Sequence, residues 1–119
     1  MKVKETIFTK EQFAEFINGI ECQVPIHAEV VADNTAVRKD CQYVFDGWNA
    51  PFLVPFDEAD ELIKSAVRSA LQRVSKQAKG TGASMTVYVA SELFKMPDYK
   101  NAEFTRAYPL LFIKFEKNS

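Results

Sequence analysis

The sequence predicts a two-layer α+β sandwich, arranged as a ferredoxin-like β-α-β-β-α-β unit with an additional C-terminal edge strand. The chain has 119 residues, which is the size of one domain, so we expect residues 1–119 to form a single α+β domain. Apolar residues recur at helical spacing in two segments, and the segments between them alternate or are rich in β-branched residues. Both helices are therefore expected on one face of an antiparallel sheet.

The first strand is expected at residues 2–8 and the first helix at residues 10–18. Thr9 and Gln12 have the spacing of a capping box, which marks the start of a helix. The apolar positions of this helix recur three to four residues apart and predict one buried stripe: Phe13, Phe16, Ile17 and Ile20.

Two further segments, at residues 22–32 and 42–48, predict an antiparallel hairpin. The first alternates between apolar and polar residues, and turn-forming residues follow it at positions 33–35. Cys22 and Cys41 could approach one another in such a hairpin and form a disulfide. The alternative, two reduced and mostly buried thiols, suits a chain without a secretion signal.

The segment at residues 48–56 combines helix-breaking and strand-breaking prolines with large apolar side chains. We expect it to pack over the core as a flap. The alternative is an exposed apolar surface that awaits a partner, because large apolar patches on monomers mark interaction sites.

The long helix is expected at residues 57–79, because apolar residues recur there at three- and four-residue steps over about six turns. Its first turn is acidic and its remainder is basic, which is the order that the helix dipole favours. The acidic residues could be imagined as a cation site, but the dipole already explains them: Asp57, Glu58, Asp60 and Glu61. Gly80 is expected to end the helix.

Two strands are expected after this helix, at residues 85–90 and 108–115, with a polar loop between them. The first is rich in β-branched residues and is predicted to be central. The last is apolar on both faces and contains Pro109 near its start, so we place it at the sheet edge. A homodimer could then form through this final edge strand.

Charge and hydropathy exclude several classes of function. Fifteen basic residues against sixteen acidic ones give a net charge of −1, which argues against a dedicated nucleic-acid binder. No apolar segment is long enough to span a membrane, and the N-terminus lacks the apolar region of a secretory signal. We therefore expect a cytoplasmic protein that does not bind membranes.

The sequence contains no recognisable catalytic or metal-binding motif, so we predict no catalytic residue, no metal site and no cofactor. His27 is the only histidine, and neither cysteine lies at the spacing of a zinc site. The Gly80-Thr81-Gly82 segment follows a predicted helix, whereas phosphate-binding glycines follow a strand and begin a helix. An enzyme with an unrecognised site remains an alternative.

We expect a non-enzymatic module that binds another protein, as an adaptor, an inhibitor or an assembly component. Small chains without a motif are common among phage and mobile-element accessory proteins. Aromatic residues in predicted loops and edges are the candidate contacts, since aromatic anchors dominate binding energy: Trp48, Phe52, Tyr99 and Phe104.

Nucleic-acid binding through the long helix is the sharpest alternative. Residues 64–79 contain five basic side chains and no acidic one, so the net charge conceals a local basic patch. Part of it could form a stripe along phosphates. The candidate residues are Lys64, Arg68, Arg73, Lys76 and Lys79.

Overall fold

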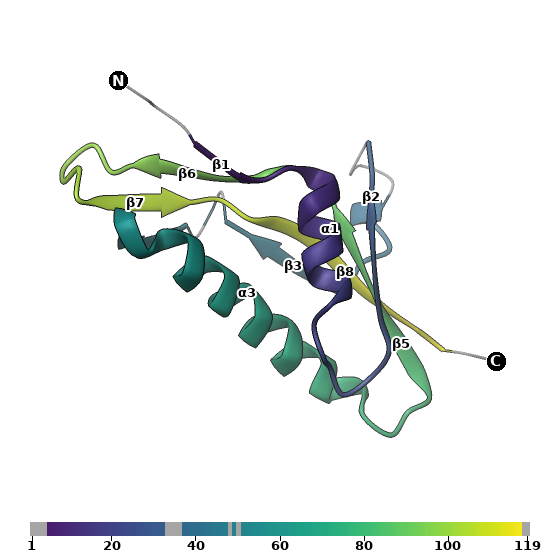
Figure 1. Ribbon diagram of the computed structural model, residues 1–119. Coiled ribbons are helices and arrows are strands. Elements are labelled where there is room, and N and C mark those ends of the chain that lie inside the picture. The colour runs from purple at the N-terminus through teal and green to yellow at the C-terminus, as the bar shows by residue number, and fades with distance from the viewer. Residues whose placement is uncertain (1–4, 33–36, 48, 50, 118–119) are drawn as a thin grey trace.

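A computed structural model of the chain describes residues 5–32, 37–47, 49 and 51–117. The predicted α+β class is confirmed: two α-helices pack against strands that form two four-stranded sheets (Figure 1). The molecule is elongated, with extents of 52 × 26 × 22 Å.

The two sheets differ in strand direction. The first is antiparallel and contains, in spatial order, β1 (Glu5–Phe8), β6 (Leu93–Pro97), β7 (Phe104–Ala107) and β4 (Phe52–Pro55). The second is mixed and contains, in spatial order, β2 (Ile26–Val30), β5 (Ala83–Val89), β8 (Leu110–Lys117) and β3 (Tyr43–Asp46). In the second sheet β2 runs parallel to β5, and the other two pairings are antiparallel.

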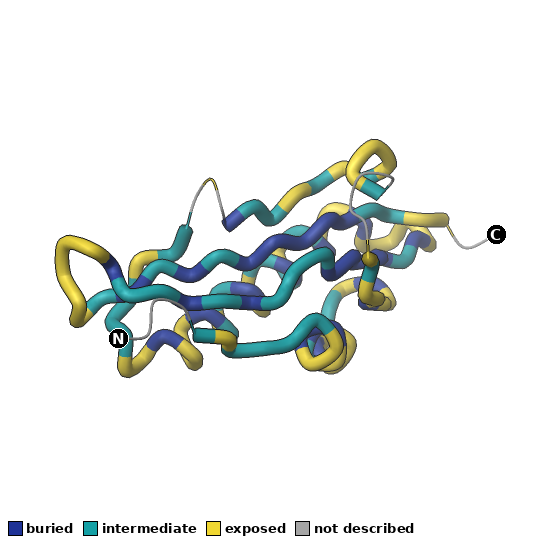
Figure 2. The backbone as a smooth tube through the Cα atoms, turned by 90° about the horizontal axis from the view of Figure 1, so that it is seen from above, coloured by how far each residue is buried: buried dark blue, intermediate teal, exposed yellow. Residues whose placement is uncertain are grey.

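The chain crosses between the two sheets twice, each time from a central strand of one sheet to a central strand of the other. Strand β5 leads into β6 after three residues, and β7 leads into β8 after two. Since β5 pairs with β8 and β6 pairs with β7, residues 83–117 form one long, bent hairpin that is shared by both sheets (Figures 1 and 2).

Helices α1 (Lys10–Asn18) and α3 (Ala59–Ser75) cover the same face of this assembly (Figure 1). The 3₁₀ turns η1 (Phe56–Glu58) and η2 (Lys76–Ala78) extend α3 at its two ends. The first helix has the predicted bounds, and its capping box is present. The Thr9 N–H donates to Gln12 Oε1 over 3.0 Å, and the Gln12 N–H donates to Thr9 Oγ1 over 3.2 Å.

The core lies between the helices and both sheets. Helix α3 buries one residue in every four, which forms a single stripe along its axis: Ala59, Ile63, Val67, Leu71 and Ser75. This stripe belongs to the same cluster as buried residues of α1, β5 and β8, among them Phe13, Ile17, Met85, Val87 and Leu111. Tyr88, Leu110 and Phe112 form a smaller cluster on the opposite face.

The predicted hairpin of residues 22–32 and 42–48 is wrong. Strand β2 pairs in parallel with β5, with Ile26 opposite Met85, and β3 pairs with β8, with Tyr43 opposite Ile113. Alternation indicates a strand but does not identify its partner, and the central strands β5 and β8 offer the larger apolar surface. Both Cys22 and Cys41 are free.

The prediction that the final strand lies at an edge is also wrong, because β8 lies between β5 and β3. Leu111, Phe112 and Ile113 are buried on its two faces, as an interior strand requires. Pro109 precedes the strand, so its missing amide costs no ladder hydrogen bond. The homodimer expected through this strand therefore loses its structural basis.

The ferredoxin-like topology is not confirmed, because the strands form two sheets. The expected flap contains β4, whose residues pair with β7, and the expected polar loop contains β6 and β7. These strands are only four or five residues long, so they show little periodicity of their own.

Candidate binding groove

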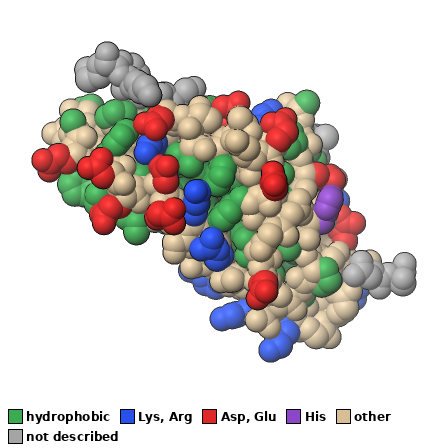
Figure 3. Space-filling model, in the orientation of Figure 1, with side chains coloured by type: hydrophobic (Ala, Val, Ile, Leu, Met, Phe, Trp, Pro, Cys, Tyr) green, Lys and Arg blue, Asp and Glu red, His purple; other side chains and the backbone are tan. Residues whose placement is uncertain are grey.

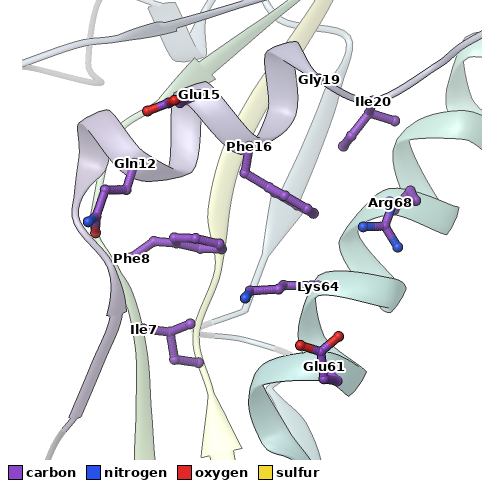
Figure 4. A pocket seen from close by; sticks show the side chains of 10 residues that line it. All are labelled: Ile7, Phe8, Gln12, Glu15, Phe16, Gly19, Ile20, Glu61, Lys64 and Arg68. Atoms are coloured by element: carbon purple, nitrogen blue, oxygen red, sulfur yellow. The ribbon is translucent and has the colours of Figure 1, made fainter.

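An open groove of about 710 Å³ lies between α1 and α3 (Figure 4). Strand β1 and helix α1 form one wall and α3 forms the other. We call this hollow the α1–α3 groove, and its lining consists of Ile7, Phe8, Gln12, Glu15, Phe16, Gly19, Ile20, Glu61, Lys64 and Arg68.

The floor of the groove is aromatic. The capping box at Thr9 fixes the turn from β1 into α1, so the last side chain of the strand lies against the helix. The rings of Phe8 and Phe16 stack with centroids 5.4 Å apart and planes at 22°. Phe8 also stacks on the buried Phe13, at 5.8 Å, which anchors the floor to the core.

Two cations from α3 stand over these rings (Figure 4). Lys64 Nζ lies 5.1 Å from the centre of the Phe8 ring, and Arg68 Cζ lies 5.4 Å from the centre of the Phe16 ring. The four-residue spacing places both side chains on one side of the helix. Within the described part of the chain, neither cation forms an ion pair with a carboxylate.

Two carboxylates belong to the same groove. Glu15 comes from α1 and Glu61 from α3, and both residues are exposed. The groove therefore combines an apolar floor, two cations that pair with no carboxylate of the described residues, and two anionic groups at its margin. A long polyanion that filled the groove would be repelled by Glu15 and Glu61.

A second hollow of about 600 Å³ lies further along α3, beside the segment that follows α1. Side-chain hydrogen bonds tie this segment to the helix: Gln72 Nε2 donates to the carbonyl oxygen of Glu21 over 3.0 Å, and Ser75 Oγ accepts from the Gln23 amide over 3.1 Å. Arg73 and Lys76 line this hollow.

The five basic residues predicted from the sequence thus occupy different places. Lys64 and Arg68 line the α1–α3 groove, and Arg73 and Lys76 line the second hollow. Lys79 follows η2 and is exposed. The side chains of Lys64 and Lys76 start about 18 Å apart along the helix axis, at 1.5 Å per residue.

The predicted aromatic contacts are also dispersed. Phe52 is half-buried, packs against the core and has its ring 5.7 Å from that of Phe45, in a hollow on the other side of α3. Phe104 is half-buried at the start of β7, whereas Tyr99 in the turn before it is 82% exposed. Trp48 lies outside the described residues. Replacement of Phe52 would therefore disturb packing as well as any contact with a partner.

The groove aromatics Phe8 and Phe16 were not predicted as site residues. Phe16 has the helical spacing of a core residue and Phe8 ends the first strand, so both positions indicate packing against the core, and packing is part of what they do. The sequence signal for this site is the pair of cations four residues apart on the long helix. Such a pair forms a binding site only where another element supplies the opposite wall of a groove.

Outside the groove, the histidine and the two cysteines of the chain lie apart from one another in the fold. His27 Nε2 lies 3.2 Å from Glu29 Oε2 on the exposed face of β2, and the described residues contain no group of three potential metal ligands. Burial raises the pKa of the Cys22 thiol, and a hydrogen bond with Ser75 lowers it by less. Burial likewise raises the pKa of Cys41. Both thiols are therefore neutral at physiological pH.

Comparison with known proteins gives no family model, curated protein or solved structure that matches the chain. Among the described residues, no helix is both long enough and apolar enough to cross a membrane. Function is accordingly inferred from the groove itself.

Proposed function

We propose that this protein is a non-enzymatic protein-binding module whose α1–α3 groove receives a partner segment with a carboxylate beside an apolar side chain. The observation that supports this proposal is the position of Lys64 and Arg68 over Phe8 and Phe16, with no carboxylate paired to either cation within the described chain. Such a module would act as an adaptor, an inhibitor or an assembly component.

The chemistry of the groove suits a mixed segment. An apolar side chain would cover the exposed parts of the aromatic floor, at about 25 cal/mol for each Å² removed from water. A neighbouring carboxylate would pair with Lys64 or Arg68, and a charge-assisted hydrogen bond contributes about 1.5–3 kcal/mol. Glu15 and Glu61 can accept hydrogen bonds from the amides of the same segment.

Nucleic-acid binding is the second candidate, and the basic residues of α3 are the observation that favours it. A nucleic acid would bind through phosphate contacts, so its affinity would fall steeply with salt. The contacting residues would be Lys64, Arg68, Arg73, Lys76 and Lys79. We rank it second because Glu15 and Glu61 would repel a continuous polyanion, whereas a segment with a single carboxylate would be repelled less.

The proposal is tested by photo-crosslinking in the native host. A photoreactive amino acid at Gln12, on the groove, should give a protease-sensitive adduct. The same amino acid at Val44, which is 47% exposed in β3 and does not line the groove, should give none. The Lys64→Glu/Arg68→Glu double variant should abolish the Gln12 adduct while circular dichroism remains unchanged.

Three outcomes would contradict the proposal. An adduct at Gln12 that survives the double variant would show that the two cations are not needed. An adduct formed only at Val44 would place the partner on the opposite face. A nuclease-sensitive adduct at Gln12 would favour the second candidate.

A further inference from the structure

The outward face of α3 carries acidic side chains at one end and basic side chains at the other. Glu58 and Glu61 are exposed at its start, and Arg73 and Lys76 are exposed at its end. Within the described chain, none of these four groups forms an ion pair. Figure 3 shows red side chains over the beginning of α3 and blue ones over its middle and end.

The two charged ends are symmetric about the middle of the helix. Glu58 and Lys76 lie nine residues on either side of Val67, and Glu61 and Arg73 lie six residues on either side. A second α3, laid antiparallel across the first with the two Val67 positions aligned, would therefore meet each acid with a base. The same register produces every contact twice, as a two-fold interface requires.

The centre of this face permits close approach of two helices. Ser65 and Ser69 lie two residues on either side of Val67, and both are exposed and small. Helices approach to about 8–10 Å when the side chains at the contact allow it. In this register Leu62, which is 42% exposed, faces the half-buried Gln72 of the second copy.

We infer that a second copy of this chain binds the outward face of α3 in this antiparallel register. The helix dipole favours the charge order within each copy, and the same order makes the face complementary to itself. Lys64 and Arg68 point toward α1 and take no part (Figure 4). Glu61 also lines the α1–α3 groove, whereas Glu58, Arg73 and Lys76 lie outside it, so the Arg73→Glu/Lys76→Glu variant tests the interface without changing the groove.

An exchange of charges tests this inference. One variant carries Glu58→Lys/Glu61→Lys and the other carries Arg73→Glu/Lys76→Glu. Sedimentation equilibrium of the wild type at about 0.05 M salt should give a dimer that weakens at about 1 M salt, where surface charges are screened. Each variant alone should dimerise at least about tenfold more weakly, because like charges then face each other. An equimolar mixture should restore dimerisation, because the positive side chains of one variant then face the negative side chains of the other.

Matched controls separate the register from general charge effects. Glu11→Lys/Glu103→Lys makes the same charge change, includes a first-turn acid of α1, and should dimerise like the wild type. Circular dichroism checks that every variant is folded. A wild type that stays monomeric at millimolar concentration and low salt would overturn the inference. So would two variants that still dimerise alone, or a mixture of folded variants that does not restore the dimer.

Discussion

Lys95 in β6 and Asp60 in the first turn of α3 form an ion pair in which Nζ lies 2.8 Å from Oδ1. The lysine side chain is only 7% exposed, and its ammonium also lies 4.4 Å from the centre of the Phe56 ring. The pair therefore joins the beginning of α3 to the first sheet.

Removal of the acidic partner should destabilise the protein more than removal of a neighbouring charge. Asp60→Asn leaves the buried Lys95 ammonium without its closest partner, so the free energy of unfolding should fall by about 1.5–3 kcal/mol. Urea denaturation measures this, with Glu58→Gln as the matched control. The double variant Asp60→Asn/Lys95→Met should recover much of the loss, because an apolar side chain needs no partner. Equal effects of Asp60→Asn and Glu58→Gln would refute this role.

Two leucines of α3 test how the helix is oriented. Leu71 is fully buried and Leu62 is 42% exposed. Leu71→Ala should lower the free energy of unfolding by about 2–5 kcal/mol, because it leaves a cavity in the core. Leu62→Ala makes the same chemical change and should cost less than about 1 kcal/mol. Equal losses in thermal or urea denaturation would mean that the helix presents a different face to the sheet.

Gly47 is required by a close approach of two chain segments. A Cβ at this position would lie 2.5 Å from the Cδ of Pro109, and the Gly47 amide donates to the Pro109 carbonyl oxygen over 2.6 Å. Gly47→Ala should therefore destabilise the fold by at least about 1–3 kcal/mol. In Gly19→Ala the new Cβ meets its nearest atom at 3.5 Å, so this control should be close to neutral. A neutral Gly47→Ala in equilibrium unfolding would contradict the contact.

The thiols of Cys22 and Cys41 should make the free energy of unfolding depend on pH. Burial raises the pKa of Cys22 and Cys41 above the ordinary value of 9.0, so folding favours the protonated thiol. This contribution to stability is complete below about pH 9 and is lost as the pH rises through the folded-state pKa. At pH 8, both thiols should react more slowly with a disulfide reagent in the native protein than in urea. Equal rates would show that burial does not protect them.

The helices could be predicted from the sequence, whereas the strand pairing could not. Thr9, Gln12 and the apolar stripe of α3 act within a few residues of one another, so local patterns identify both helices. Strand β2 pairs with β5, more than fifty residues away in sequence, and alternation carries no information about such a partner.

The site could be predicted only in part, for a related reason. Lys64 and Arg68 stand out on the long helix because of their charge and their four-residue spacing. In the sequence, Phe8 resembles any other packed aromatic residue. Only the fold places it beside Phe16 of α1 and under Lys64 of α3. A groove between two elements depends on their tertiary arrangement, which no local pattern shows.

Titration of the ¹⁵N-labelled protein with a short peptide, followed by NMR, tests the proposed groove most directly. The peptide carries one glutamate between two leucines, and a control peptide carries glutamine in its place. The glutamate peptide should shift the amide resonances of Phe8, Phe16, Lys64 and Arg68. The control peptide should bind at least about fivefold more weakly, which corresponds to about 1 kcal/mol for the lost charge. Equal binding of the two peptides, or shifts confined to residues outside the groove, would contradict the account.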